Sequence, residues 1–193
     1  MNYKHLRASD YVTSTWSGGT TTQLGIAPAG AVYADRDFLW RVSSATVDLE
    51  VSDFTALPDY DRLIATVEGS IDVTHNGGAA ISLSPYQVHR FDGGWQTRSV
   101  GRCRDFNLMT RKGRCFGQMT ALTAPGTVCV DDNASTFANT DAILYCGHGT
   151  VAVVLDGSTI TLQQGEALQM EHAAGLTLSI SGEGSVIFTA AWY

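Results

Sequence analysis

The chain has 193 residues, of which 44% are hydrophobic, and it carries a formal net charge of −7. This length fits one domain or two small halves with a shared core, and the apolar fraction is ordinary for a globular protein. The acidic balance argues against nucleic-acid binding, which depends on Lys and Arg contacts to phosphates. No apolar run approaches the roughly 20 residues that span a membrane, so we expect neither a nucleic-acid nor a membrane partner.

The N-terminus lacks the charged and then apolar pattern of a secretory signal, so we expect a cytoplasmic protein. The four cysteines form no C-x-x-C pair, which argues against a zinc knuckle. In a reducing cytosol we expect them to act as small buried hydrophobes.

The first distinctive segment is Trp16–Gln23, which follows a short strand expected over residues 7–15. It joins a tryptophan, two glycines and three threonines. Glycine permits a positive φ or a close backbone approach, and threonine favours an extended chain that carries hydroxyls. Such a turn is suited to holding a small polar molecule, although an ordinary glycine-rich turn before a strand has the same composition.

Residues 38–47 are rich in aromatic and branched side chains and predict a strand. Period-two alternation places Arg41 and Ser43 on one face, among apolar neighbours. If that face is interior, Arg41 needs an anionic partner, because an unpaired buried charge is too costly. Residues 53–61 are then expected to form a loop.

Short strands continue to the end of the chain. The pairs Asn76-Gly77 and Asp156-Gly157 predict hairpin turns, and the polar residues 96–104 predict an irregular segment. The further strands are expected over residues 23–28, 62–67, 71–75, 80–83, 88–91, 105–109, 118–122, 126–130, 141–146, 150–155, 158–162, 167–170, 176–180 and 185–190. A spacing of about 8–12 residues between short strands indicates an all-β sandwich or barrel. The order of strands and turns in residues 62–91 returns in residues 142–170, which suggests a duplicated β-roll divided near residue 120.

Catalytic and metal-binding motifs are weak. None of the five histidines forms a His-x-His pair, and His89 is the single candidate ligand because it follows Pro85, where metal-binding barrels often carry one. The sequence has no G-x-S-x-G elbow, phosphate loop or dinucleotide fingerprint. We therefore assign no catalytic residue and expect no metal and no cofactor.

The remaining polar candidates are typical of an anion site. Arginine offers a planar fork that holds a carboxylate with two hydrogen bonds. The set comprises Arg41, Arg62, Ser43, the threonines 20–22 and Asn107. The alternative is that each arginine forms a structural ion pair with a nearby carboxylate. Those carboxylates are Asp59, Asp61, Glu68 and Asp105.

Several of these segments, in this order, resemble the HutD/Ves family of bicupins. The matching pieces are residues 16–23, 38–43, 57–62, 68–69, 91–93 and 105–111. The resemblance covers roughly residues 5–190, and its specific motifs all lie before residue 115. One departure is Ser17, which precedes Gly18 where the family often has Lys-Asn, so an amide that could touch a ligand is missing.

The resemblance implies a bicupin, two double-stranded β-helix (jelly-roll) barrels in one compact unit, without the usual metal ligands. Its halves would be residues 1–120 and 121–193. Family members are associated with bacterial histidine utilisation and with cold or stress response, and no firm catalytic activity is attached to them. A small acid of the histidine pathway, such as formylglutamate, is the ligand that the resemblance implies.

We therefore expect a non-catalytic or regulatory protein that binds a small carboxylate in its first barrel. The expected ligand-binding residues are Trp16, Gly19, Thr21, Gln23, Arg41, Ser43, Arg62, Phe91 and Asn107. The alternative is a cupin enzyme acting on a small acid, either metal-dependent through His89 or with Glu68 as general base. An open sheet edge would allow a homodimer.

Overall fold

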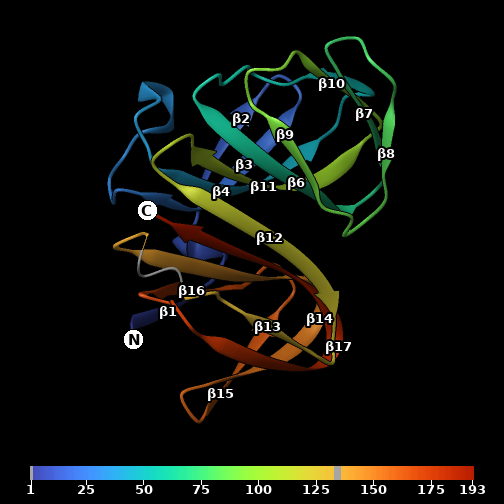
Figure 1. Cartoon of the computed structure of the whole chain (residues 1–193). Coiled ribbons are helices and arrows are strands. Elements are labelled where there is room, and N and C mark those ends of the chain that lie inside the picture. Colours follow the sequence, from blue (N-terminus) through green and yellow to red (C-terminus); the bar gives the residue numbers. More distant parts are fainter. Residues whose placement is uncertain (1, 133–135) are drawn as a thin grey trace. The chain divides into compact units, whose positions relative to one another are not determined.

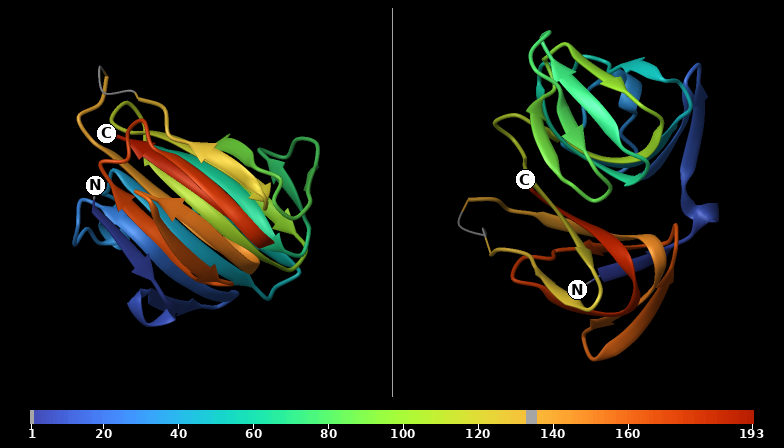
Figure 2. Two further views of the ribbon diagram at one scale, coloured as in Figure 1. Left: turned by 90° about the horizontal axis from the view of Figure 1, so that it is seen from below. Right: turned by 90° about the vertical axis from the view of Figure 1, so that its right-hand side faces the viewer.

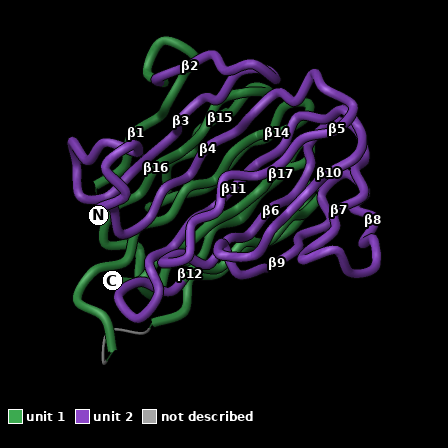
Figure 3. The backbone as a smooth tube through the Cα atoms, turned by 90° about the horizontal axis from the view of Figure 1, so that it is seen from above, with its two compact units in different colours: residues 1–11, 117–193 green, residues 12–116 purple. Residues whose placement is uncertain are grey.

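The computed structural model describes residues 2–132 and 136–193. These residues form 17 β-strands and two short 3-10 helices, Ala8–Asp10 and Tyr33–Asp35, which confirms the expected all-β class. The chain divides into two compact units (Figure 3). One unit is Val12–Phe116, and the other comprises the described parts of residues 1–11 and 117–193. No helix in the described ranges is long and apolar enough to cross a membrane.

The unit of residues 12–116 contains two antiparallel sheets whose strands curve around a common interior (Figure 2). The six-stranded sheet has the order β2 (Val12–Trp16), β3 (Gly19–Ala27), β4 (Trp40–Val47), β11 (Cys103–Arg111), β6 (Tyr60–Glu68) and β9 (His89–Asp92). The four-stranded sheet has the order β5 (Val51–Asp53), β10 (Thr97–Val100), β7 (Ile71–His75) and β8 (Ile81–Leu83). Both sheets contribute to one buried apolar cluster, which includes Ile64, Val73 and Phe91.

The other unit is built on one seven-stranded sheet. Its order is β1 (Asn2–Leu6), β16 (Ala167–Glu171), β14 (Thr140–Leu155), β17 (Thr177–Trp192) and β12 (Phe116–Thr123), with β13 (Gly126–Cys129) on β17 and β15 (Ser158–Gln163) on β14. The strands β14 and β17 pair over most of their length and bend together (Figure 1). Their inner faces bury an apolar cluster that includes Leu144, Phe188 and Trp192.

The first strand belongs to the unit of the C-terminal residues. β1 pairs antiparallel with β16, with Asn2 opposite Glu171. The expected halves, residues 1–120 and 121–193, place this strand in the N-terminal half, and the described units therefore differ from them. The physical reason is that β1 satisfies its backbone groups on a strand that is distant in sequence, which no local pattern encodes.

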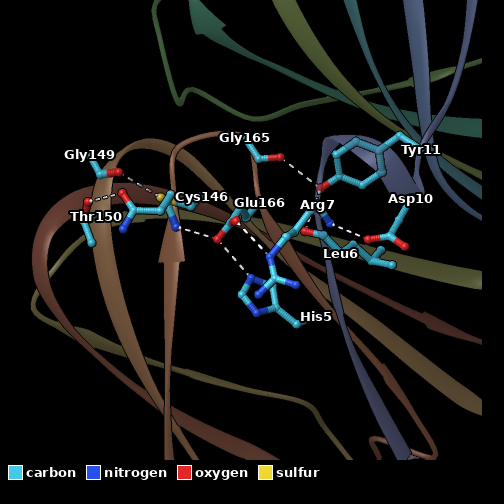
Figure 4. Close-up of polar contacts among 11 residues, drawn as sticks. His5, Leu6, Arg7, Asp10, Tyr11, Cys146, Gly149, Thr150, Gly165 and Glu166 are labelled. Atoms are coloured by element: carbon cyan, nitrogen blue, oxygen red, sulfur yellow. Dashed lines mark hydrogen bonds and ion pairs between the residues drawn. The ribbon is translucent and has the colours of Figure 1, made fainter.

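One carboxylate holds the N-terminal segment onto this unit (Figure 4). Glu166 Oε2 lies 2.9 Å from His5 Nε2, and Glu166 Oε1 lies 3.5 Å from Arg7 Nε. Tyr11 Oη donates to the carbonyl oxygen of Gly165 at 2.9 Å. Burial acts to raise the pKa of Glu166, but hydrogen bonds from the backbone of Gln163 and from His5 outweigh it, so the pKa is lowered. The carboxylate is therefore stabilised in its ionised form.

Replacing Glu166 with glutamine is expected to lower the free energy of unfolding by about 1 kcal/mol, because the amide keeps the shape but loses the charge-assisted bonds. For a chain of this size, the melting temperature should fall by about 2–4 °C. The measurement is thermal denaturation followed by circular dichroism. Glu183→Gln, at an exposed position of β17, is the matched control. Equal melting temperatures for the two variants would show that the contacts of Glu166 with the N-terminal segment do not stabilise the fold.

Two segments differ from the expected strands. Residues 7–15 contain a 3-10 helix and only part of β2, whereas residues 96–104, expected to be irregular, contain β10. The buried positions of β10 are polar: Thr97 and Ser99 point inward, and Thr97 Oγ1 lies 2.9 Å from His75 Nδ1. A strand whose inward side chains are hydroxyls shows no apolar alternation, so the sequence pattern missed it.

The strands expected over residues 141–146 and 150–155 form the single strand β14. A β-bulge follows Cys146, and Gly149 has a φ of +73° where β14 passes close to β17. A Cβ at Gly149 would overlap the carbonyl oxygen of Glu183. Glycine here permits a close approach within a continuous strand, although the sequence pattern treated it as a strand end.

Candidate functional site

Polar side chains from three adjacent strands share one face of the six-stranded sheet. β11 lies between β4 and β6, and both Arg41 and Arg62 lie opposite Met109. Two positions along β11, Asn107 lies opposite Ser43. Because opposite residues and residues two apart point to the same side of a sheet, the two arginines and Asn107 converge.

These side chains line a cavity of about 320 Å³ in the unit of residues 12–116. Of the nine expected ligand-binding residues, six line it: Trp16, Thr21, Arg41, Ser43, Arg62 and Asn107. Other lining residues that the sequence did not indicate as ligand contacts include Ser14, Tyr33, Ser52, Phe54 and Asp105. The cavity thus combines aromatic walls with charged and hydroxyl groups, a composition typical of small-molecule sites.

Arg62 belongs to this polar set and is only 6% exposed. Its Nη2 donates to Asn107 Oδ1 at 3.0 Å, and its Cζ lies 4.9 Å from the centroid of the Phe54 ring. Its Nε has no hydrogen-bond partner among the described residues. Burial lowers the pKa of Arg62 to about 10, so the guanidinium stays charged at neutral pH.

Arg41 is equally buried and is held by neighbours on two sides. Its Nε donates to Gln23 Oε1 at 2.8 Å, and its Nη1 donates to Ser43 Oγ at 3.2 Å. Its Cζ lies 4.2 Å from the centroid of the Tyr33 ring, a cation–π distance. Burial is the main reason that the pKa of Arg41 is lowered.

The structure does not pair these arginines with the carboxylates considered as structural partners. Within the described ranges, neither Arg41 nor Arg62 lies within 4.0 Å of a carboxylate oxygen. Asp61 instead lies 3.9 Å from Arg90, and Glu68 lies 3.6 Å from Arg104. The two buried guanidiniums therefore lack the close anionic partner that burial ordinarily requires.

Asp105 is the one buried acid beside them, with 5% of its surface exposed. Its Oδ1 accepts hydrogen bonds from Asn107 Nδ2 at 2.9 Å and from the backbone nitrogen of Ala45 at 3.2 Å. Burial raises the pKa of Asp105 to about 6, against the opposing attraction of Arg62. Two guanidiniums face a single buried carboxyl group, so this part of the cavity favours an anion.

The three other expected site residues do not line the cavity. Gln23 supports Arg41 through its side-chain oxygen, and Phe91 is buried beneath Arg62, whose Cζ lies 5.2 Å from the ring centroid. Gly19 lies opposite Trp16 in the β2–β3 hairpin, with a φ of +149°. A Cβ at Gly19 would overlap the carbonyl oxygen of Thr46, so this glycine has a backbone role.

Replacing Gly19 with alanine is expected to lower the free energy of unfolding by about 3 kcal/mol, because positive φ and the overlap with the Thr46 carbonyl both oppose a side chain. Urea denaturation measures the loss. Gly30→Ala is the matched control, since Gly30 also has positive φ but open space around it. If the free energy of unfolding falls no more than in the control, the close approach of Gly19 to the Thr46 carbonyl does not contribute to stability.

The alternative catalytic candidates lie outside the cavity lining. His89 Nε2 lies 2.9 Å from His75 Nε2, and burial lowers the pKa of both imidazoles. Glu68 is half exposed at the end of β6. In the described parts of the chain, no three His, Cys, Asp or Glu side chains come together in a group that could hold a metal ion.

Comparison with known proteins decides the family. The model of the HutD family matches residues 8–188 of the chain. A relative from Cronobacter sakazakii, Protein Ves, is 32% identical in an alignment of 164 residues that covers 82% of this chain and 83% of that protein. The chain belongs to the HutD/Ves family.

Solved structures agree with this membership in the HutD/Ves family. HutD from Pseudomonas fluorescens SBW25 is 25% identical, with a TM-score of 0.77 over 97% of this chain and 98% of that one. A cupin barrel domain protein from Leptotrichia buccalis, 11% identical, has a TM-score of 0.55 over 98% of this chain and 95% of that one. The fold of this HutD/Ves protein is therefore cupin-like.

Proposed function

We propose that this protein binds a small carboxylate in the cavity of residues 12–116, with Arg41 and Arg62 as the groups that hold the acid. The observation that carries the proposal is the pair of buried guanidiniums without a carboxylate within 4.0 Å among the described residues. A ligand carboxylate would supply the missing charge and accept from the unpartnered Nε of Arg62. Binding would thus relieve a cost that the unliganded fold carries.

The other features of the cavity suit a small organic acid. Its volume of about 320 Å³ falls at the lower end of the range of small-molecule sites. Trp16, Tyr33 and Phe54 provide walls for a carbon chain, and the buried Ser52 Oγ, which has no hydrogen-bond partner in the described structure, offers a further polar contact. The association of the family with histidine utilisation makes an N-formylglutamate-like acid the first ligand to test.

We propose a binding or regulatory role in preference to catalysis. Neither Glu68 nor His89, the two residues suggested for an enzyme, is among the residues that line the cavity. A binding protein needs only the charge complementarity and the walls that this cavity provides.

The test is a thermal-shift and calorimetric screen of N-formylglutamate, glutamate and glutarate, with glutaramide as a neutral analogue. At an acid concentration of about 100 times the dissociation constant, we expect a stabilisation of about 2.7 kcal/mol. The neutral analogue should give none, because it lacks the charge that the arginines require. Absence of any shift with every acid would refute the proposal.

A further inference from the structure

We propose that Asp105 selects, among small carboxylates, those that carry a hydroxyl or amide N–H donor near the acid group, by accepting that donor on its second carboxylate oxygen. This inference rests on the proposed carboxylate site. It adds to that site a ligand class, since it separates acids with a donor from acids without one. Asp105 would thus be the residue that sets specificity, while the arginines supply the affinity for the acid group.

The hydrogen bonds of Asp105 leave one of its oxygens available. Both of its bonds, from Asn107 Nδ2 and from the nitrogen of Ala45, fall on Oδ1. Oδ2 has no hydrogen-bond partner among the residues that the structure describes, and Asp105 is one of the residues lining the cavity. A carboxylate oxygen that faces a cavity without a protein donor is an open acceptor, which a ligand can satisfy.

Asn107 fixes the position of this oxygen relative to Arg62. A guanidinium only donates, so the amide oxygen of Asn107 must face Arg62 and its nitrogen must face Asp105. The unpartnered Nε of Arg62 and the open oxygen of Asp105 thus belong to side chains joined by a single amide. Because Arg62 and Asp105 both line the cavity, it presents a positive group for an anion and, across one amide, an acceptor for a neighbouring hydrogen.

This arrangement discriminates between acids of the same size. An acid without a donor leaves the Asp105 oxygen desolvated and places its own negative charge near that of the carboxylate. An acid with a hydroxyl or amide N–H removes the first penalty, because its hydrogen pairs with the oxygen, and this hydrogen bond offsets part of the charge repulsion. Sites that hydrogen-bond a substrate hydroxyl reject analogues that lack it, and we expect a preference of about 10-fold or more.

The experiment compares glutarate with 2-hydroxyglutarate by titration calorimetry at pH 8, where Asp105 is ionised because burial raises its pKa only to about 6. The wild-type protein should bind one enantiomer of the hydroxy acid about 10-fold or more tightly than glutarate. In Asp105→Asn this preference should disappear and glutarate should bind more tightly, because the cavity gains net positive charge. Asp72→Asn, an exposed change in β7 that is outside the cavity, should keep the wild-type preference.

The possible results distinguish a failure of the role proposed for Asp105 from a failure of the proposed carboxylate site. Equal affinities of the two acids for the wild-type protein would overturn the role of Asp105 while leaving the carboxylate site intact, and this comparison needs no variant to fold. A preference that persists in Asp105→Asn would also overturn it. Binding of neither acid, nor of any other carboxylate, would overturn the proposed function together with this inference.

Discussion

Replacing Arg62 with methionine is expected to weaken binding of the proposed carboxylate by about 100-fold or more. Methionine has a similar length and fills the space beside Phe54 and Phe91, but it removes one of the two buried positive charges. It also removes the Nε donor that has no partner in the described structure. Arg41 remains to hold the acid but offers few free donors, because its Nε and one hydrogen of its Nη1 are already bound to Gln23 and Ser43.

The same substitution should change the free energy of unfolding of the unliganded protein by only about 1 kcal/mol. The loss of the hydrogen bond to Asn107 destabilises the fold, whereas removal of a buried charge without a close counterion stabilises it. Calorimetric titration and urea denaturation of the variant measure the two effects. Arg102→Met, at an exposed arginine near Glu50, is the control. An affinity of Arg62→Met within about threefold of wild type would exclude Arg62 from the site.

Asp105→Asn is expected to alter the pH dependence of stability more than any other single Asp→Asn change in the described chain. Burial raises the pKa of Asp105 from its ordinary value of 3.8 to about 6 in the folded protein. Between these values the folded state keeps a proton that the unfolded state has lost, so wild-type stability falls as pH rises through this window. Across the whole window, the free energy of unfolding of the wild-type protein falls by about 3 kcal/mol through this group.

Asparagine does not titrate, so the variant lacks this contribution. Relative to wild type, Asp105→Asn should gain about 3 kcal/mol in free energy of unfolding between about pH 3.5 and pH 7. Urea denaturation at several pH values measures the difference, and Asp72→Asn serves again as the exposed control. Parallel pH profiles for wild type and Asp105→Asn would show that folding leaves the pKa of this carboxyl group unchanged.

Features that depend on adjacent residues could be predicted from the sequence. The hairpins at Asn76-Gly77 and Asp156-Gly157 form as expected, with positive φ at both residues of each pair. The strand containing Arg41 also forms as expected, and its alternation correctly placed Arg41 and Ser43 on one face. These features follow from turn chemistry and from the two-residue period of a strand, both of which are local.

Features that depend on pairing between distant segments could not be predicted from the sequence. The sequence treated Asp105 as one of several ion-pair partners, whereas the register of β11 brings it to the cavity wall. Likewise, Gln23 and Phe91 have the residue types of ligand contacts, yet they support the two arginines from outside the cavity. A residue type indicates what a side chain can do, but the register decides which surface it faces.

The sequence by itself determined the strand-rich fold, its glycine turns and the chemistry of a charged set that suits a carboxylate. Only the tertiary structure decided that Arg62 and Asn107, which are 45 residues apart, meet through a hydrogen bond while the guanidinium lacks a carboxylate partner among the described residues. The physical reason is that local patterns set backbone conformation, whereas burial and charge compensation depend on strand registers formed across long stretches of chain.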